Sequence, residues 1–178
     1  MLVGRYDRSE SCYDTSVNTI AEIGKNDPTI QYSDRPTVKV ILQKGTDILI
    51  LNDGLLPGGG VDDGEADIQA IFRELEEELG VTVTNSKAIG TIIQYRDFLE
   101  KRYVIKGFTA DFVAFDKNIH PQDSGEAQFS YRWLQKGVAL KLIEDSINSY
   151  DTLAIRDDFL QGKLFNLKTS RELLLALQ

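Results

Sequence analysis

The sequence predicts a mixed α/β domain in which a β-sheet and several helices pack in layers. Runs of β-branched and apolar residues stand on both sides of one strongly amphipathic helical segment, at 66–79. Further helical segments follow at the end of the chain. Because the strands do not alternate regularly with helices, the pattern does not fit a pure βαβ repeat.

Length and composition are those of one soluble globular domain. The chain has 178 residues, of which 42% are hydrophobic and 27% charged. Its net charge of −8 argues against non-specific binding to nucleic acid or to an anionic membrane. Cys12 is the only cysteine, and no apolar run approaches the roughly 20 residues that span a bilayer. We therefore expect a cytoplasmic protein, with neither nucleic acid nor membrane as a partner.

The amino-terminal segment, residues 1–36, is polar and shows no sustained periodicity. It is predicted to be either a loosely packed extension or a short strand with its connection. The strand and helix patterns that follow predict a main domain over 37–148. Residues 149–178 form a helical tail that we expect to pack on the same domain.

The first clear strands are the β-rich runs at 37–43 and 47–52. Lys44-Gly45-Thr46 separates them, which predicts a hairpin. A turn-rich loop with three successive glycines at 58–60 then leads into the helix.

The helix at 66–79 has one apolar face beside one acidic strip. At about 100° per residue, five apolar side chains form a continuous face: Ile68, Ile71, Phe72, Leu75 and Leu79. Glu74, Glu77 and Glu78 lie in a strip beside that face, whereas Glu76 lies on the other flank and is expected in solvent. Gly80 stands where a glycine ends a helix in the left-handed conformation.

The elements after this helix follow from the same periodicities. Strands are predicted at 81–84, 89–95, 102–115 and 129–134, and helices near 134–147, near 150–160 and from 170.

The acidic strip indicates a cation site. Like charges at i and i+4 each destabilise an isolated helix by roughly 0.2–0.5 kcal/mol, so the cluster needs compensation. Mg²⁺ prefers hard oxygen ligands, and carboxylates at i, i+3 and i+4 of one rigid helix can point at one or a few ions. Glycines in the preceding loop allow backbone groups to approach the metal or a phosphate closely.

The spacing of these residues is that of a known motif. Gly59, Glu65, Arg73-Glu74-Leu75, Glu77-Glu78 and Gly80-Val81 occupy every fixed position of the Nudix box. The sequence therefore resembles the Nudix hydrolases. The resemblance implies an α/β/α sandwich with a mixed sheet. It also implies a pyrophosphatase that uses Mg²⁺, or Mn²⁺ in its place, to hydrolyse a nucleoside diphosphate linked to another group.

The resemblance also implies roles for individual residues. Glu77 and Glu78 are the core metal ligands, and Glu74 is either a further ligand or the base that activates water. The carbonyl of Gly58 is an additional ligand, and Arg73 orients the glutamates. Support of the loop and helix falls to three residues: Gly59, Glu65 and Gly80. The alternative interpretation is a solvated acidic helix face with a structural Arg–Glu pair.

Residues downstream of the box are weaker candidates. Many family members add an acid from a late loop, which makes Glu126 the first candidate and Asp123 the second, against a solvent-exposed role for either. Tyr95, Arg96 and Arg102 are candidate substrate contacts, although an ordinary strand surface explains them equally well.

The substrate class stays open. A nucleoside triphosphate, a damaged nucleotide and a nucleotide sugar or ADP-ribose are all compatible with the motif. The alternatives to an enzyme are a sensor of the same fold that binds a nucleotide without cleaving it, and an interaction module in which the box is unused. A homodimer could use residues 1–36 or the helical tail, but the sequence does not establish one.

Overall fold

A mixed β-sheet forms the centre of the structure. The computed structural model describes residues 18–115, 130–151, 153 and 157–177. Within these residues the sheet has six strands, in the order β1-β4-β5-β2-β3-β6. The strands are β1 Thr19–Ile23, β2 Ser33–Lys44, β3 Asp47–Leu51, β4 Val81–Arg96, β5 Lys101–Phe115 and β6 Tyr131–Gln135. The pairs β1–β4 and β2–β5 are parallel, and the other neighbouring strands are antiparallel.

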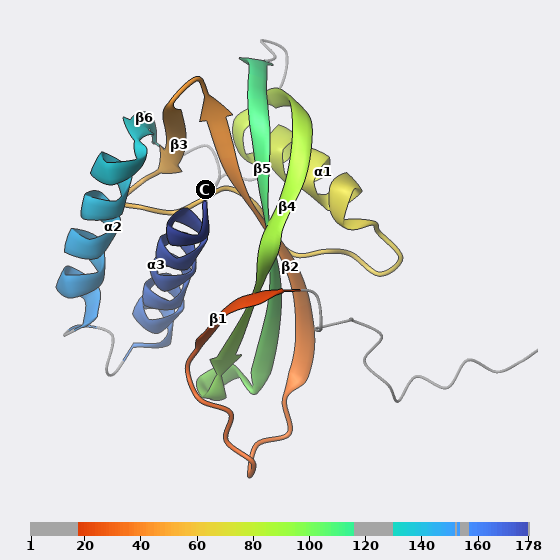
Figure 1. The fold of residues 1–178 in the computed structure, drawn as a ribbon. Helices are drawn as coiled ribbons and strands as arrows, with labels where there is room; N and C mark the ends of the chain where they lie inside the picture. Colours follow the sequence, from red (N-terminus) through yellow and green to blue (C-terminus); the bar gives the residue numbers. More distant parts are fainter. Residues whose placement is uncertain (1–17, 116–129, 152, 154–156, 178) are drawn as a thin grey trace, which may run out of the picture.

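Helices cover both faces of this sheet, which gives the α/β/α layering (Figure 1). Helix α1 (Asp67–Leu79) packs on one face, and helices α2 (Lys136–Asp151) and α3 (Asp158–Ala176) pack on the other. Each face has its own apolar core. Leu49, Ile71 and Leu75 belong to the core under α1, whereas Ile41 and Ile143 belong to the core under α2 and α3. No helix in the described part of the chain is long and apolar enough to cross a bilayer.

The amino-terminal segment contributes more to the sheet than its polar sequence indicates. Of the two predicted alternatives, the described part adopts the strand: β1 pairs in parallel with β4. Strand β2 begins at Ser33, and from Ser33 to Gln43 it is in continuous register with β5. The pairing partners of both segments lie more than 60 residues away in the chain, so local periodicity could not reveal them.

Two predicted interruptions are wrong. The strands expected at 81–84 and 89–95 form one strand, β4, because the irregular residues between them are accommodated as register shifts against β5. The tail helices expected at 150–160 and from 170 are also wrong as separate pieces. Helix α3 runs without a break from Asp158, with Gly162 inside it, since packing on β1, β4 and α2 outweighs the low helix propensity of glycine.

The expected apolar face of α1 is only partly buried. Ile71 and Leu75 are fully buried, but Ile68 and Phe72 are 41% and 46% exposed. The sheet therefore buries only part of the apolar face and leaves Ile68 and Phe72 in contact with solvent. Glu76 is exposed, as predicted.

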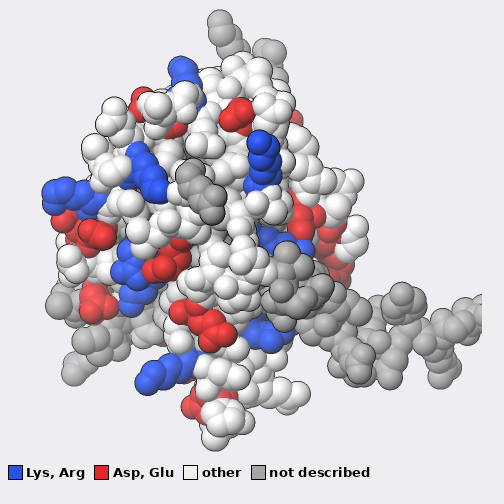
Figure 2. Space-filling view, in the orientation of Figure 1, with Lys and Arg blue, Asp and Glu red and all other residues white. Residues whose placement is uncertain are grey.

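Charges of both signs are interspersed over the face of the molecule in Figure 2, and neither sign forms a continuous field there.

Candidate active site

Helix α1 has defined ends, which fix the rotation of its acidic strip. At its start, the backbone N–H of Ala66 donates to the side-chain oxygen of Gln69 (3.0 Å), and Asp67 pairs with Lys106 of β5 (2.6 Å). At its end, Gly80 adopts the left-handed conformation, with φ 59° and ψ 44°, and its N–H bonds to carbonyls of the last turn. The predicted role of Gly80 at the helix end is therefore confirmed.

The glycine loop is held against the sheet by backbone hydrogen bonds. The N–H groups of Val38 and Val40 donate to the carbonyls of Gly59 (2.9 Å) and Pro57 (3.0 Å). On the other side of the loop, the N–H of Gly58 donates to a carboxylate oxygen of Glu78 (2.9 Å). The loop is thus fixed between β2 and the acidic strip of α1.

Gly59 makes the closest approach between this loop and the helix. A Cβ placed at Gly59 would lie 2.4 Å from a carboxylate oxygen of Glu74. The Glu74 carboxylate therefore rests directly on the backbone of the loop, in space that any larger residue would fill.

Arg73 ties the glutamates to the loop. Its guanidinium bonds to Glu65 (2.8 and 2.9 Å), to Glu74 (2.8 Å), to Glu77 (3.3 Å) and to the carbonyl of Gly60 (2.8 Å). These hydrogen bonds, above all those with Glu65, raise the pKa of Arg73 further above its ordinary value. The guanidinium is thus fixed between the glycine loop and the acidic strip, and its expected role in orienting the glutamates stays a prediction.

Glu65 is held by several hydrogen bonds. Hydrogen bonds from Arg73, together with one from the N–H of Asp62 (3.0 Å), lower the pKa of Glu65 from 4.5 to about 2. Between these two values the unfolded chain binds more protons at this position than the folded chain does. The stabilisation by Glu65 is therefore complete above about pH 4.5 and is lost as the pH falls towards 2.

A comparison of Glu65→Gln with the parent protein tests this linkage. We expect the parent to melt at a higher temperature at pH 6, and the difference between the two melting temperatures to close as the pH falls from 4.5 to 2. In an Arg73→Met background, the same difference should be small at every pH. Thermal melts followed by circular dichroism measure both series, and a pH-independent difference would contradict the role of the Arg73–Glu65 pair.

The donor set of this site fits a hard divalent cation. Glu74, Glu77, Glu78 and the Gly58 carbonyl present only oxygen atoms, and the Glu74 carboxylate fits against Gly59 without intervening side chains. Within the described residues, no three acidic, histidine or cysteine side chains already converge as a ready metal cluster. Arg73 and the Gly58 N–H occupy carboxylate oxygens instead, so a metal would have to exchange with these partners.

Lys39 of β2 adds a cation that the sequence interpretation missed. Its ammonium donates to the carbonyls of Leu56 (3.1 Å) and Gly58. Burial lowers the pKa of Lys39, while the nearby Glu78 and Glu74 act in the opposite direction. In the sequence, the signal for this position is a single charged residue within the apolar run 38–42.

Only two of the three predicted substrate contacts lie together: Tyr95 and Arg102 stand opposite each other on β4 and β5, and Arg96 lies on the other face of the sheet. Arg96 is 6% exposed and faces α3, where it bonds to Gln94 (2.5 Å) and Asn166 (2.7 Å). Tyr95 alternates to the other face and packs edge-on against Tyr32. Arg102, also on that face, is paired with Asp34 through two hydrogen bonds of 2.7 Å. Their contact with substrate stays a prediction.

A hollow of about 530 Å³ opens beside Arg96. Helix α3 supplies Phe159, Lys163 and Asn166, and the turn after β4 supplies Phe98 and Leu99. Phe159 is 80% exposed and Leu99 is 45% exposed. The hollow therefore combines aromatic and apolar surface with cationic and amide groups, as small-molecule sites do. The residues of α3 could not be assigned to it from sequence, because no local pattern places that helix over β4.

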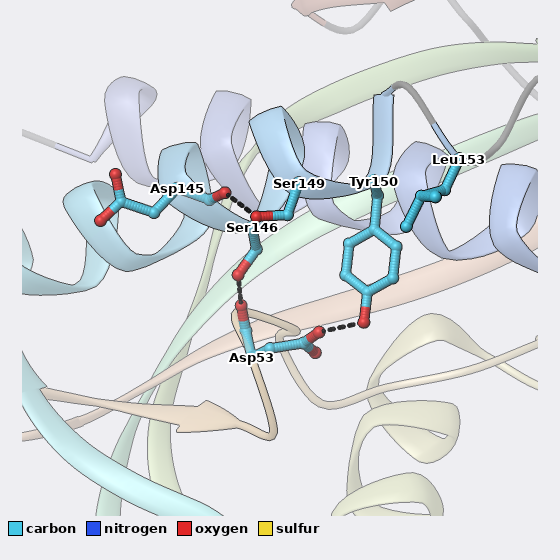
Figure 3. Close-up of a pocket in the computed structure, with 6 residues that line it drawn as sticks. All are labelled: Asp53, Asp145, Ser146, Ser149, Tyr150 and Leu153. Atoms are coloured by element: carbon cyan, nitrogen blue, oxygen red, sulfur yellow. Dashed lines mark hydrogen bonds between the residues drawn. The ribbon is translucent and has the colours of Figure 1, made fainter.

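A second hollow, of about 380 Å³, lies between α2 and the loop after β3 (Figure 3). Asp53 accepts hydrogen bonds from Tyr150 (2.8 Å) and from Lys163 (2.9 Å), and its carbonyl accepts one from Ser146 (2.6 Å). Burial favours the protonated form of Asp53, but the bonds from Lys163 and Tyr150 outweigh it and leave the pKa lowered. These contacts tie the loop to α2 and α3, which is a structural role.

Three residues considered in the sequence lie outside the described residues. They are the candidate acids Glu126 and Asp123, together with Cys12.

Comparison with known proteins identifies relatives of this arrangement. The family model of the NUDIX domain matches residues 33–153. An RNA pyrophosphohydrolase of Vibrio cholerae serotype O1 is 57% identical over 35 residues, so the match spans 20% of this chain and 20% of that relative.

Solved structures resemble the fold at low identity. A NUDIX hydrolase from Nitrosomonas europaea is 20% identical with a TM-score of 0.51, and the match covers 77% of this chain and 95% of that one. A MutT NUDIX hydrolase from Burkholderia pseudomallei is also 20% identical, with a TM-score of 0.49, over 59% of this chain and 85% of that one.

Proposed function

The chain belongs to the Nudix hydrolase family, and on that premise we propose that it is a Mg²⁺-dependent pyrophosphohydrolase. Its substrate is a nucleoside diphosphate linked to another group, and Mn²⁺ can replace Mg²⁺. One observation supports this best: Arg73 holds Glu74 and Glu77 beside a glycine loop that bonds to Glu78. A solvated acidic helix face would need neither the loop nor the shared arginine.

The residues of the acidic strip and of the glycine loop have different roles in the proposed reaction. Glu77 and Glu78 would hold the metal, with Glu74 either as a further ligand or as the base that takes a proton from water. When bound, the metal supplies Lewis-acid activation of the phosphorus centre and neutralises charge on the diphosphate. Arg73 keeps the carboxylates oriented, and Gly59 leaves room for the Glu74 carboxylate against the loop.

The hollow beside Arg96 is the proposed site for the nucleoside part of the substrate. By the alternation of side chains along strands, Arg96 and Lys39 both point to the face that α2 and α3 cover. Phe159 offers an exposed ring for stacking, and Lys163 and Arg96 supply positive charge. We expect the enzyme to act in the cytoplasm on a small nucleotide. A homodimer is compatible with this activity.

A substrate panel tests the proposed activity. Purified protein with Mg²⁺ is incubated with nucleoside triphosphates, an oxidised nucleotide, ADP-ribose, a nucleotide sugar and a 5′-triphosphorylated RNA oligonucleotide. We expect at least one member to be cleaved at a phosphoric anhydride, with a nucleoside monophosphate or inorganic pyrophosphate among the products. Tight binding without cleavage of any member would instead favour a non-hydrolytic sensor.

Phe159→Ala tests the nucleoside site on the substrate that the panel identifies. Loss of base stacking should raise KM roughly tenfold or more, with a smaller change in kcat. Leu175→Ala is the matched control, because Leu175 is an exposed apolar residue of the same helix that does not line the hollow. Steady-state kinetics measure both variants, and equal KM values in the two would place the nucleoside elsewhere.

A further inference from the structure

Strand β2 carries a lysine between two core positions. Val38 and Val40 are fully buried in the core under α1. Because successive side chains of a strand point to opposite faces, Lys39 points away from α1, towards the face that α2 and α3 cover. A lysine at such a position needs oxygen partners for its three donors.

Those partners come from the glycine loop. The ammonium of Lys39 donates to the carbonyl of Leu56 (3.1 Å) and to the carbonyl of Gly58. The N–H groups of Val38 and Val40 donate to the neighbouring carbonyls of Gly59 and Pro57, and so hold this part of the loop against β2. Both acceptors of the Lys39 ammonium are therefore backbone carbonyls in a segment that is held against the same strand.

The same residue, Gly58, also contacts the acidic strip. Its N–H donates to Glu78 (2.9 Å), so Gly58 lies between the Lys39 ammonium and the Glu78 carboxylate. The Gly58 carbonyl is the backbone oxygen that the proposed function offers to the divalent ion. The ammonium takes one lone pair of that oxygen, and its positive charge opposes a metal ion at the other.

We propose that Lys39 is a cation of the active site that competes with the divalent ion. Its ammonium binds the Gly58 carbonyl and so weakens metal binding by the glutamates. This inference rests on the proposed function, because it assigns the divalent ion to Glu74, Glu77 and Glu78. Lys39 lowers metal affinity in two ways: it takes up one lone pair of an oxygen ligand, and it repels a second positive charge nearby. It leaves a positive charge at the loop where a diphosphate would lie.

Metal binding without substrate tests the proposal. Lys39→Met keeps the length of the side chain and removes its charge and its donors. We expect the Kd for Mn²⁺ to fall at least about tenfold, measured by electron paramagnetic resonance of free Mn²⁺ in the absence of nucleotide. Lys39→Arg keeps the charge and should bind Mn²⁺ within about threefold of the parent.

Two further variants keep the test decisive. Lys106→Met removes one positive charge that pairs with Asp67 on the same helix. Its Kd for Mn²⁺ should stay within about twofold of the parent, which controls for the overall change in charge. If Lys39→Met does not fold by circular dichroism, Lys39→Gln removes the charge and keeps an amide donor, and a smaller tightening in the same direction is expected.

The outcomes separate the inference from the proposed function. An unchanged or weaker Mn²⁺ affinity in the neutral Lys39 variants overturns the inference, as does equal tightening in Lys39→Arg. If the parent protein cleaves a nucleotide of the panel, but the Kd for Mn²⁺ is the same in the neutral Lys39 variants, the inference alone is refuted. A protein with the expected dependence on Lys39 that cleaves nothing in the panel refutes the proposed function alone.

Discussion

Glu77→Gln should lower kcat by about a thousandfold on whichever nucleotide the protein cleaves. The substitution keeps the shape of the side chain but removes the negative charge that would hold the divalent ion. In the structure, Glu77 lies on the acidic strip of α1, and its carboxylate is bonded to Arg73 (3.3 Å). Steady-state kinetics with saturating Mg²⁺ measure the effect.

Glu76→Gln is the matched control for that experiment. Glu76 belongs to the same run of glutamates but is exposed on the other flank of the helix. The same chemical change there should leave kcat within about twofold, because surface substitutions away from a site are usually close to neutral. Near-normal turnover in Glu77→Gln would refute the assignment of the metal site, whereas equal losses in both variants would point to a general effect of helix charge.

The fold of Glu77→Gln should be close to that of the parent. Arg73 retains Glu65 (2.8 Å) and Glu74 (2.8 Å) as partners, so its guanidinium stays paired. We expect the melting temperature without metal to change little, while the added stabilisation by Mg²⁺ disappears. Loss of the metal effect alone would separate a ligand role from a structural one.

The acidic strip could be predicted from sequence because its determinants are local. The 3.6-residue period placed Glu74, Glu77 and Glu78 together and set Glu76 apart, and Gly80 marked the end of the helix. These features depend on residues within a few turns of one another. Tertiary contacts decide which of these side chains are buried, but they do not change the positions of the side chains around the helix axis.

The surroundings of the strip depend on distant segments, and the sequence interpretation missed them. Lys39 meets Gly58 because β2 pairs with the loop, and Arg96 meets Asn166 because α3 packs over β4. Ile68 and Phe72 are apolar and follow the helical period, yet the sheet does not reach far enough to bury them. Periodicity predicts which side of an element is apolar, but not how much of it a partner covers.

The two adjacent glycines of the loop should respond differently to alanine. Gly58 has φ 115°, a conformation that L residues rarely adopt, and a Cβ there would lie 2.4 Å from the backbone oxygen of Val38. Relief of this clash requires the loop to leave β2 and break its backbone hydrogen bonds. Gly58→Ala should therefore lower the free energy of unfolding by about 2–4 kcal/mol.

For a domain of this size, that loss corresponds to a fall in melting temperature of roughly 5–15 °C. At Gly59, a Cβ meets only the end of the Glu74 side chain, which can rotate away. Gly59→Ala should therefore melt within about 2 °C of the parent, yet lose at least tenfold in kcat, because Glu74 no longer rests on the loop. Calorimetry and kinetics on the two variants measure this contrast. Equal melting temperatures, or a fully active Gly59→Ala, would contradict the contacts that hold the glycine loop between β2 and α1.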